Sequence, residues 1–382
     1  QLCQASAQDL LANTMRGMLD RVKKRSPKFD EHIIEDVIVG CLSQLGEQGA
    51  NIGRVATLLA GIPEEACSCT VNQYCNSGLK AIQFGAQSIM VGNGDAVICS
   101  GVELMSHYGM GSDVMTAFQA QLPVRMTERM GDIGMATPQG VCAEMVSEDE
   151  GHTRDQLDRF GAWSMKKAVE ATRKGWHAEN TIPFTVKWEG NERSVTKDEV
   201  LRDKAADDFE GFVADLGGLP TPFKPDGRVT AGNSSQIVDG AAACLLMSAD
   251  KAQELGLEPL CKIKSLAVAG GAPVPMLLAP IPTMHKALKR AGLTIDDMDV
   301  IEPNEAFATP CLAFANAFGY AFDDPRVNPT GGAIALGHPI GASGVMYFGE
   351  MVHHLKRTKG KYGIQTLCGG GGLGVAAVVE AV

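Results

Sequence analysis

One pattern occurs in both the first and the last third of this chain and limits the folds it can adopt. In each copy, a reactive residue type is followed by Ser-Gly and then by an amphipathic helix. The reactive residues are Cys75, before Ser77-Gly78, and His338, before Ser343-Gly344. The apolar positions share one helical spacing and are Leu79, Ile82, Ala86 and Ile89, then Val345, Phe348, Val352 and Leu355. Two copies in the same phase predict duplicated α/β halves that pack together.

The middle of the chain has a different composition from both ends. From 107 to 229 charged residues are dense, all three tryptophans occur, and helical patterns outnumber strand patterns. Buried-strand character returns at "GRVTAGNSSQIVDGAAACLLMSAD". We therefore expect an N-terminal half formed by 1–106 with 230–258, an inserted α-rich loop domain at 107–229, and a C-terminal half at 259–382.

Charge and cysteine usage restrict the partners and the compartment. Lys plus Arg total 34 against 45 Asp plus Glu, a formal charge of −11, which argues against nucleic acid as the partner. No apolar run approaches the ~20 residues that span a bilayer. Eleven irregularly spaced cysteines favour a reducing compartment, so we expect a cytoplasmic location. The chain opens on a helical pattern, so we also expect that a first strand or an organelle-targeting segment precedes Gln1.

Cys75 and His338 are the first candidates for chemistry. Cys75 follows a short predicted strand and opens a helix, where the positive end of the helix dipole favours a thiolate. The alternative is a buried structural cysteine. His338 lies in a glycine-rich run that lets a backbone approach closely, and its alternative is an ordinary turn histidine.

Two further loops follow predicted strands. Cys368 precedes four glycines, whose N–H groups can stabilise an oxyanion, although a tight turn gives the same pattern. Asn304 can orient a water or a histidine, or can act as a helix N-cap. The glycine runs lack the spacing and acidic residue of a dinucleotide loop, and Cys67 and Cys69 lack a second pair at zinc spacing.

These loops together resemble the thiolase family in order and in spacing. "VNQYCNSG" resembles its nucleophile motif, "NEAFA" its second active-site loop, "GGAIALGHPIGASG" its histidine loop and "CGGGGLG" its second cysteine loop. "TAGNSSQIVDGAA" and "APIP" match as well, so the resemblance covers essentially the whole chain. It implies the thiolase fold, an α/β fold with two βαβαβαββ halves in five αβαβα layers and a loop domain inserted into the first half.

The resemblance also implies a role for each matching residue. Cys75 is the nucleophile that becomes acylated, His338 takes its proton, and Cys368 is the acid/base for the acetyl-CoA carbanion. Asn304 holds a water that forms one oxyanion hole with His338, and the N–H groups of Cys75 and Gly370 form the other. The implied reaction is thiolytic cleavage of 3-ketoacyl-CoA to acetyl-CoA and a shortened acyl-CoA. No metal or resident cofactor is implied, and coenzyme A is a co-substrate.

Weaker matches concern substrate binding. "DEVLR" resembles a segment whose arginine, here Arg202, meets the adenine end of coenzyme A. Ser235 matches a position near the pantetheine, and Met276 and Phe307 are expected to wall the acyl pocket.

Several departures from the family pattern bear on the substrate. Pro138-Gln139-Gly140 stands where short-chain biosynthetic members typically carry His-Met-Gly, and their long tetramerisation loop looks absent between Met105 and Gly134. Gln236 replaces a usual glycine. We therefore expect a degradative enzyme for longer or bulkier acyl chains and a homodimer, with a tetramer as the alternative assembly. The alternatives are a biosynthetic acetoacetyl-CoA thiolase and a non-catalytic subunit of a β-oxidation complex.

Overall fold

The computed structural model describes residues 2–119 and 125–382 and contains two mixed four-stranded sheets. The first sheet has the order β2-β1-β3-β6 and comprises β1 (Ile34–Gly40), β2 (Cys67–Val71), β3 (Ala96–Leu104) and β6 (Asp239–Met247). The second has the order β7-β10-β9-β8 and comprises β7 (Cys261–Gly270), β8 (Val300–Pro303), β9 (Tyr362–Gly369) and β10 (Leu373–Ala381). The strands β1-β3-β6 and β8-β9-β10 repeat one arrangement, in which a parallel pair is followed by an antiparallel pair.

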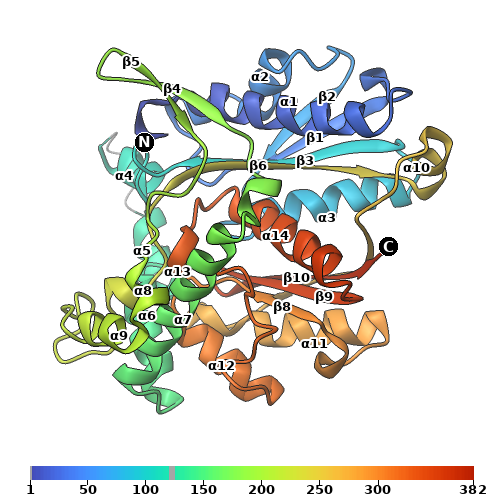
Figure 1. Ribbon diagram of the computed structural model, residues 1–382. Helices are drawn as coiled ribbons and strands as arrows, with labels where there is room; N and C mark the ends of the chain where they lie inside the picture. The colour runs from blue at the N-terminus through green and yellow to red at the C-terminus, as the bar shows by residue number, and fades with distance from the viewer. Residues whose placement is uncertain (1, 120–124) are drawn as a thin grey trace.

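Helices and sheets alternate in five layers (Figure 1). The middle layer holds α3 (Ser77–Met90) and α14 (Ser343–Thr358) between the sheets. One outer layer holds α1 (Ala7–Arg25) and α2 (Ile52–Leu59), and the other holds α11 (Pro280–Ala291) and α12 (Ala308–Phe318). The apolar faces predicted for α3 and α14 are buried between the sheets, which confirms the duplicated α/β fold.

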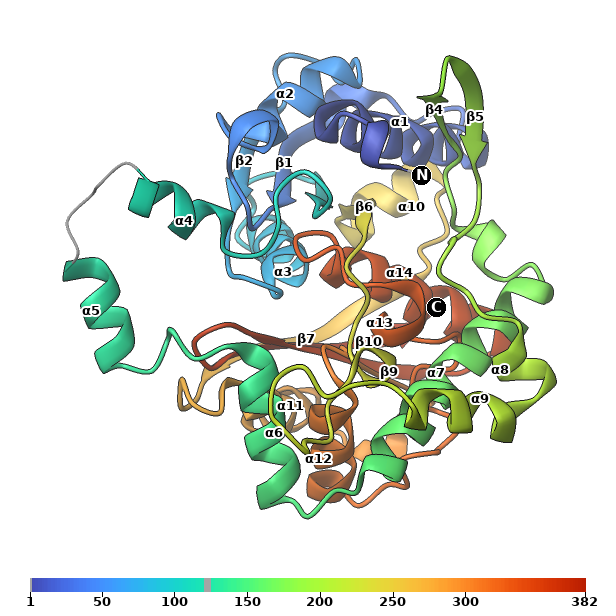
Figure 2. The ribbon, with the colours of Figure 1, turned by 90° about the vertical axis from the view of Figure 1, so that its left-hand side faces the viewer.

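The chain between β3 and β6 lies mainly on one side of the layers, the side that faces the viewer in Figure 2. Its helices are α4 (Ser112–Gln119), α5 (Arg125–Asp132), α6 (Gln139–Asp149), α7 (Arg154–Arg173), α8 (Lys204–Asp207) and α9 (Phe209–Gly217). A hairpin of β4 (Phe184–Trp188) and β5 (Asn191–Val195) returns to α1, where Arg21 Nη2 donates to Thr181 O at 2.6 Å. The segment is therefore α-rich, but part of it packs on the N-terminal half.

The two sheets differ at one edge. β7 covers the outer edge of β10, whereas among the described residues no strand pairs with the outer edge of β6. A largely apolar cavity of about 1010 Å³ runs along β6 and is lined by α1, α3, α10 (Ala249–Leu255) and α14. Within residues 2–119 and 125–382, no helix has both the length and the apolarity that crossing a bilayer requires.

Candidate active site

The two repeated Ser-Gly pairs meet where α3 and α14 begin. A Cβ on Gly344 would overlap the backbone nitrogen of Leu79, and a Cβ on Gly78 would lie 2.9 Å from Gly341 O and 3.0 Å from Val345 N. Only glycine permits this approach of two helix ends. The junction brings the Cys75 turn and the His338 loop together, and Ile340 of that loop packs against Cys75 in a small buried cluster.

The turn that carries Cys75 is held by short polar bonds. Gln73 N donates to Ser77 Oγ at 2.8 Å, and Ser77 Oγ donates to Tyr74 O at 2.6 Å. Tyr74 has a φ of 53°, an uncommon left-handed conformation for a residue other than glycine. The tight turn places Cys75 directly before Asn76, the N-cap of α3, and leaves the thiol 4% exposed.

Burial dominates the electrostatics of Cys75. Desolvation raises the pKa of its thiol to about 12, although hydrogen bonds from its own backbone N–H and from the Gln139 side chain lower it. In the resting protein the loss of water therefore outweighs the stabilisation of a thiolate by the helix end. A protonated Cys75 needs a base to become a nucleophile.

His338 has the geometry of that base. Its Nδ1 lies 2.7 Å from Ser343 Oγ, and the same hydroxyl donates to Pro339 O at 2.9 Å. The hydroxyl therefore accepts the Nδ1 proton, and the lone pair of the neutral ring is on Nε2. Among the described residues Nε2 has no hydrogen-bond partner, and burial lowers the pKa of the ring to about 4, which keeps it neutral.

Backbone bonds hold the rest of the histidine loop. His338 N donates to Gln236 O at 3.0 Å, and Gln236 N donates to Ala333 O at 3.2 Å. Gln236 thus supports the loop through its main chain. Tyr347 Oη also donates to Gly337 O at 2.6 Å.

Cys368 lies near the end of β9, next to the Cys75 turn. With its nitrogen facing them, the Asn76 amide donates to Leu367 O at 3.0 Å and to Cys368 O at 3.3 Å. Burial raises the pKa of the Cys368 thiol, and the nearby Cys75 sulfur raises it further. The glycines that follow are pressed against other loops: Gly370 lies against the Tyr74 ring, and Gly372 has a φ of 78°.

Asn304 lies just beyond β8. Its N–H donates to Thr366 O at 2.8 Å, while both atoms of its buried amide have no partner within the described part of the chain. Pro303 is the last residue of β8, at the edge of the sheet, where its missing N–H disturbs no ladder. The side chain can therefore bond a substrate or a water without breaking a protein contact.

The residues predicted to bind substrate lie in two places. Met276 and Phe307 are both buried in one core cluster with Cys368, and the Phe223 and Phe307 rings meet edge to face at 6.1 Å. Ser235 N donates to Ala306 O at 3.0 Å, which sets Ser235 beside the Phe307 loop. Arg202 instead lies in the inserted segment, where its guanidinium donates to Val200 O at 2.9 Å.

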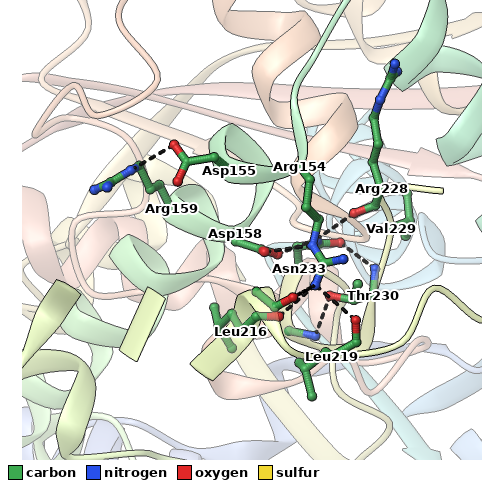
Figure 3. A network of polar contacts seen from close by, with 12 residues as sticks. Arg154, Asp155, Asp158, Arg159, Leu216, Leu219, Arg228, Val229, Thr230 and Asn233 are labelled. Atoms are coloured by element: carbon green, nitrogen blue, oxygen red, sulfur yellow. Dashed lines mark hydrogen bonds and ion pairs between the residues drawn. The ribbon is translucent and has the colours of Figure 1, made fainter. Parts of the chain in front are cut away.

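A polar network anchors the segment that leads to Ser235 (Figure 3). Asp158 accepts from Arg154 Nε at 2.7 Å and from Asn233 Nδ2 at 2.8 Å. Asn233 Oδ1 accepts from Thr230 N at 2.9 Å, and Arg154 Nη2 donates to Leu216 O at 2.7 Å. The inserted helices thereby fix the start of "TAGNSS".

Sequence reasoning assigned no role to three side chains of this site: Ser343, Gln139 and Glu103. Ser343 was visible as part of the repeated Ser-Gly pair, and Gln139 as a departure from the family pattern. Glu103 had one signal, an acidic residue at the end of an otherwise apolar strand. No cluster of three or more His, Cys, Asp or Glu side chains suited to a metal ion occurs among the residues that the structure describes.

Comparison with known proteins identifies the family. The description "Thiolase, N-terminal domain" matches residues 1–250, and "Thiolase, C-terminal domain" matches residues 257–381. Together they cover nearly the whole chain, which therefore belongs to the thiolase family. The predicted fold and the predicted class of enzyme, an acyltransferase, are thereby confirmed.

Named relatives are similar to this chain in sequence over almost their full lengths. A 3-ketoacyl-CoA thiolase of Idiomarina loihiensis is 42% identical over 380 residues, 98% of this chain and 93% of the relative. A 3-ketoacyl-CoA thiolase of Alcanivorax borkumensis is 40% identical, covering 96% of this chain and 90% of the relative. The 3-oxoadipyl-CoA/3-oxo-5,6-dehydrosuberyl-CoA thiolase of Escherichia coli is 40% identical, covering 100% and 95%.

Proposed function

We propose that this thiolase cleaves 3-ketoacyl-CoA with coenzyme A through an acyl-Cys75 intermediate. The observation that carries the proposal is that the His338 loop packs against Cys75 through Ile340, with the Cys368 sulfur near enough to Cys75 to respond to its charge. Among the described residues His338 Nε2 has no hydrogen-bond partner, so it can accept a proton. The relatives named 3-ketoacyl-CoA thiolase support the substrate class.

The first half-reaction forms the acyl-enzyme. His338 Nε2 takes the Cys75 proton as the sulfur attacks the C3 ketone of the substrate. The C2–C3 bond then breaks, C3 stays on Cys75 as a thioester, and Cys368 gives its proton to C2 of the leaving acetyl-CoA. Oxyanions form in turn on two carbonyls, which Asn304 with a water and His338, and the N–H groups of Cys75 and Gly370, would stabilise.

The second half-reaction restores both thiols. The Cys368 thiolate takes the proton of coenzyme A, whose sulfur attacks the thioester carbon. The shortened acyl-CoA leaves, and Cys75 recovers its proton from His338. The Cys75 proton returns from His338, and the proton that Cys368 gave to acetyl-CoA is replaced by the thiol proton of coenzyme A, so both cysteines are restored after each turnover.

The intermediate gives a direct test. Wild-type protein mixed with a 3-ketoacyl-CoA in the absence of coenzyme A should gain the mass of the shortened acyl group on the peptide that contains Cys75. Cys75→Ala should gain none and lose turnover, whereas Cys99→Ala, a buried cysteine on β3, should behave as wild type. Turnover by Cys75→Ala would overturn the proposal.

We propose longer or bulkier acyl groups as substrates. Met276, Phe223 and Phe307 offer an apolar wall, and Gln139 stands where short-chain members typically have Met. Thiolysis rates along a series from acetoacetyl-CoA to 3-ketohexadecanoyl-CoA test this point. A maximum at acetoacetyl-CoA would favour the biosynthetic alternative instead.

We also propose roles in coenzyme A binding for Arg202 and Ser235. Arg202 carries an exposed guanidinium on the inserted segment, and this cation is suited to bind the phosphates or the adenine end of coenzyme A. Ser235 lies beside the loop of Phe307. Arg202→Ala should raise KM for coenzyme A and leave the rate of Cys75 alkylation by iodoacetamide unchanged.

The proposed domain division is 1–106 with 230–258, 107–229, and 259–382. The return of the chain to the first sheet at β6 and the family boundary between residues 250 and 257 support it. All eleven cysteines are unpaired, in keeping with the proposed cytoplasmic, reducing location.

A homodimer is the proposed assembly. β2 is an edge strand, and Phe84, Met90 and Val91 expose apolar surface on the neighbouring α3. Two such edges can pair antiparallel about a twofold axis. Phe84→Glu with Met90→Glu should convert a dimer to a monomer in light scattering, whereas Met145→Glu in the inserted segment should not; a wild-type monomer would contradict the proposal.

A further inference from the structure

Glu103 is a fully buried carboxylate that neither half-reaction uses. It lies near the end of β3 and accepts four hydrogen bonds. Oε1 accepts from Ser43 N at 3.0 Å and from Gln48 Nε2 at 2.9 Å. Oε2 accepts from Leu42 N at 2.9 Å and from Gly341 N at 3.1 Å.

The bond to Gly341 crosses from the N-terminal half to the histidine loop. Gly341 lies in the turn that follows His338, where Ala342 N donates to Pro339 O at 2.8 Å. On the other side of His338, Glu305 of the C-terminal half accepts from Ile334 N at 3.0 Å. The loop is thus held on both sides of the imidazole by a carboxylate, one from each half.

Glu103 also fixes the surroundings of Cys75. Leu42, whose N–H it binds, packs with Ile340 against Cys75. Burial is the main cause that raises the pKa of Cys75, and the Glu103 charge raises it further. One side chain therefore sets the neighbours of the nucleophile and the loop of the base.

We propose that Glu103 is a positioning residue that holds His338 in line with Cys75 across the interface between the two halves. The inference rests on the proposed roles of Cys75 and His338. Gln at this position keeps the size but replaces one acceptor oxygen by an NH₂ group, which would face backbone N–H donors. The loops must then move apart, and small displacements of a reacting group are costly.

The test is a double-mutant cycle between Glu103→Gln and His338→Ala. With the best substrate of the chain-length series, we expect Glu103→Gln to lower kcat about 30-fold and to change KM less than about threefold. In the His338→Ala background it should lower the residual kcat less than about twofold, because the group that it positions is gone.

Glu144→Gln is the matched control. Glu144 is also buried and accepts from two backbone N–H groups, those of Arg228 at 2.9 Å and Val229 at 2.7 Å, but it does not touch the histidine loop. In the double variant, the fold decreases in kcat caused by Glu144→Gln and by His338→Ala should multiply. Glu103→Asp is the second variant in case Glu103→Gln does not fold; it keeps the charge, and we expect partial recovery of kcat with the same coupling.

The outcomes separate the two proposals. Full turnover by His338→Ala would refute the role of His338 and with it the proposed mechanism. Loss of turnover in His338→Ala, together with a wild-type kcat or a fully multiplicative effect of the Glu103 variants, would refute only the positioning role.

Discussion

The Ser343 hydroxyl fixes the tautomer of His338. It accepts from His338 Nδ1 at 2.7 Å because its own proton is donated to Pro339 O at 2.9 Å. The lone pair of the ring is therefore on Nε2, the nitrogen without a protein partner among the described residues. A residue of the repeated Ser-Gly pair thus prepares the imidazole of the same loop to act as a base.

Removal of this hydroxyl should impair catalysis more than folding. Ser343→Ala leaves Nδ1 without an acceptor, so we expect the other tautomer to become populated and kcat to fall about tenfold or more. Steady-state kinetics check this expectation. The control is Ser26→Ala, which removes an equally buried hydroxyl bond to Leu255 O at 2.6 Å far from the site. Equal kcat values for the two variants would contradict the prediction.

Gln139 should lower the pKa of the nucleophile. Burial raises the pKa of Cys75 to about 12, and the Gln139 side chain opposes this by a hydrogen bond to sulfur. A bond to a charged acceptor stabilises the thiolate, so Gln139→Met should raise the pKa further, by about one unit. Alkylation of the Cys75 peptide by iodoacetamide, followed against pH by mass spectrometry, should slow about tenfold at pH 8.

A charged variant checks the sign of this effect. Gln139→Glu brings a negative charge to the sulfur and should slow alkylation at least as much as Gln139→Met. Faster alkylation in both variants would show that Gln139 shields the thiol rather than stabilising its anion.

Acid should destabilise the protein partly through His338. Burial lowers the pKa of its ring to about 4 in the folded state, whereas the unfolded chain binds the proton below about 6.5. Its contribution to stability is therefore present above pH 6.5 and is lost as the pH falls toward 4. By linkage the loss is about 2 kcal/mol between pH 7.5 and pH 5.

This prediction is checked by measuring the free energy of unfolding of the wild type and of His338→Asn in denaturant at pH 7.5 and at pH 5. His353 and His354, whose pKa values burial also lowers to about 4, are present in both proteins and cancel in the difference. The variant should lose less stability on acidification, and an equal loss would contradict a neutral, buried His338.

Sequence alone could predict the fold because the same local pattern, a strand, a loop and an amphipathic helix, occurs in both halves of the chain. The helical phase after Gly78 and Gly344 and the strands before Cys75 and Cys368 are local features, and the structure has them where predicted. The family is confirmed by comparison, whereas the catalytic roles of Cys75, His338 and Cys368 stay predictions.

Contacts between distant segments could not be predicted in the same way. Glu103 lies near the end of one strand among several, and its importance depends on Gly341, which only the packing of the two halves brings near. The raised pKa of the Cys75 thiol could not be predicted for a related reason. The helix end is visible in a sequence, but complete burial of the sulfur depends on loops from both halves.

The junction of α3 and α14 should tolerate no side chain at Gly344. A Cβ there would overlap the backbone nitrogen of Leu79, so Gly344→Ala must push apart two helices that are packed between sheets. We expect a loss of about 2 kcal/mol or more in denaturant unfolding and a lower kcat, because the Cys75 turn and the His338 loop separate. Gly349→Ala lies on the same helix, where a Cβ meets nothing within 4 Å, and should gain up to about 1 kcal/mol from helix propensity. If the two variants were equally stable, the close approach of the two helices would not be the reason for a glycine at position 344.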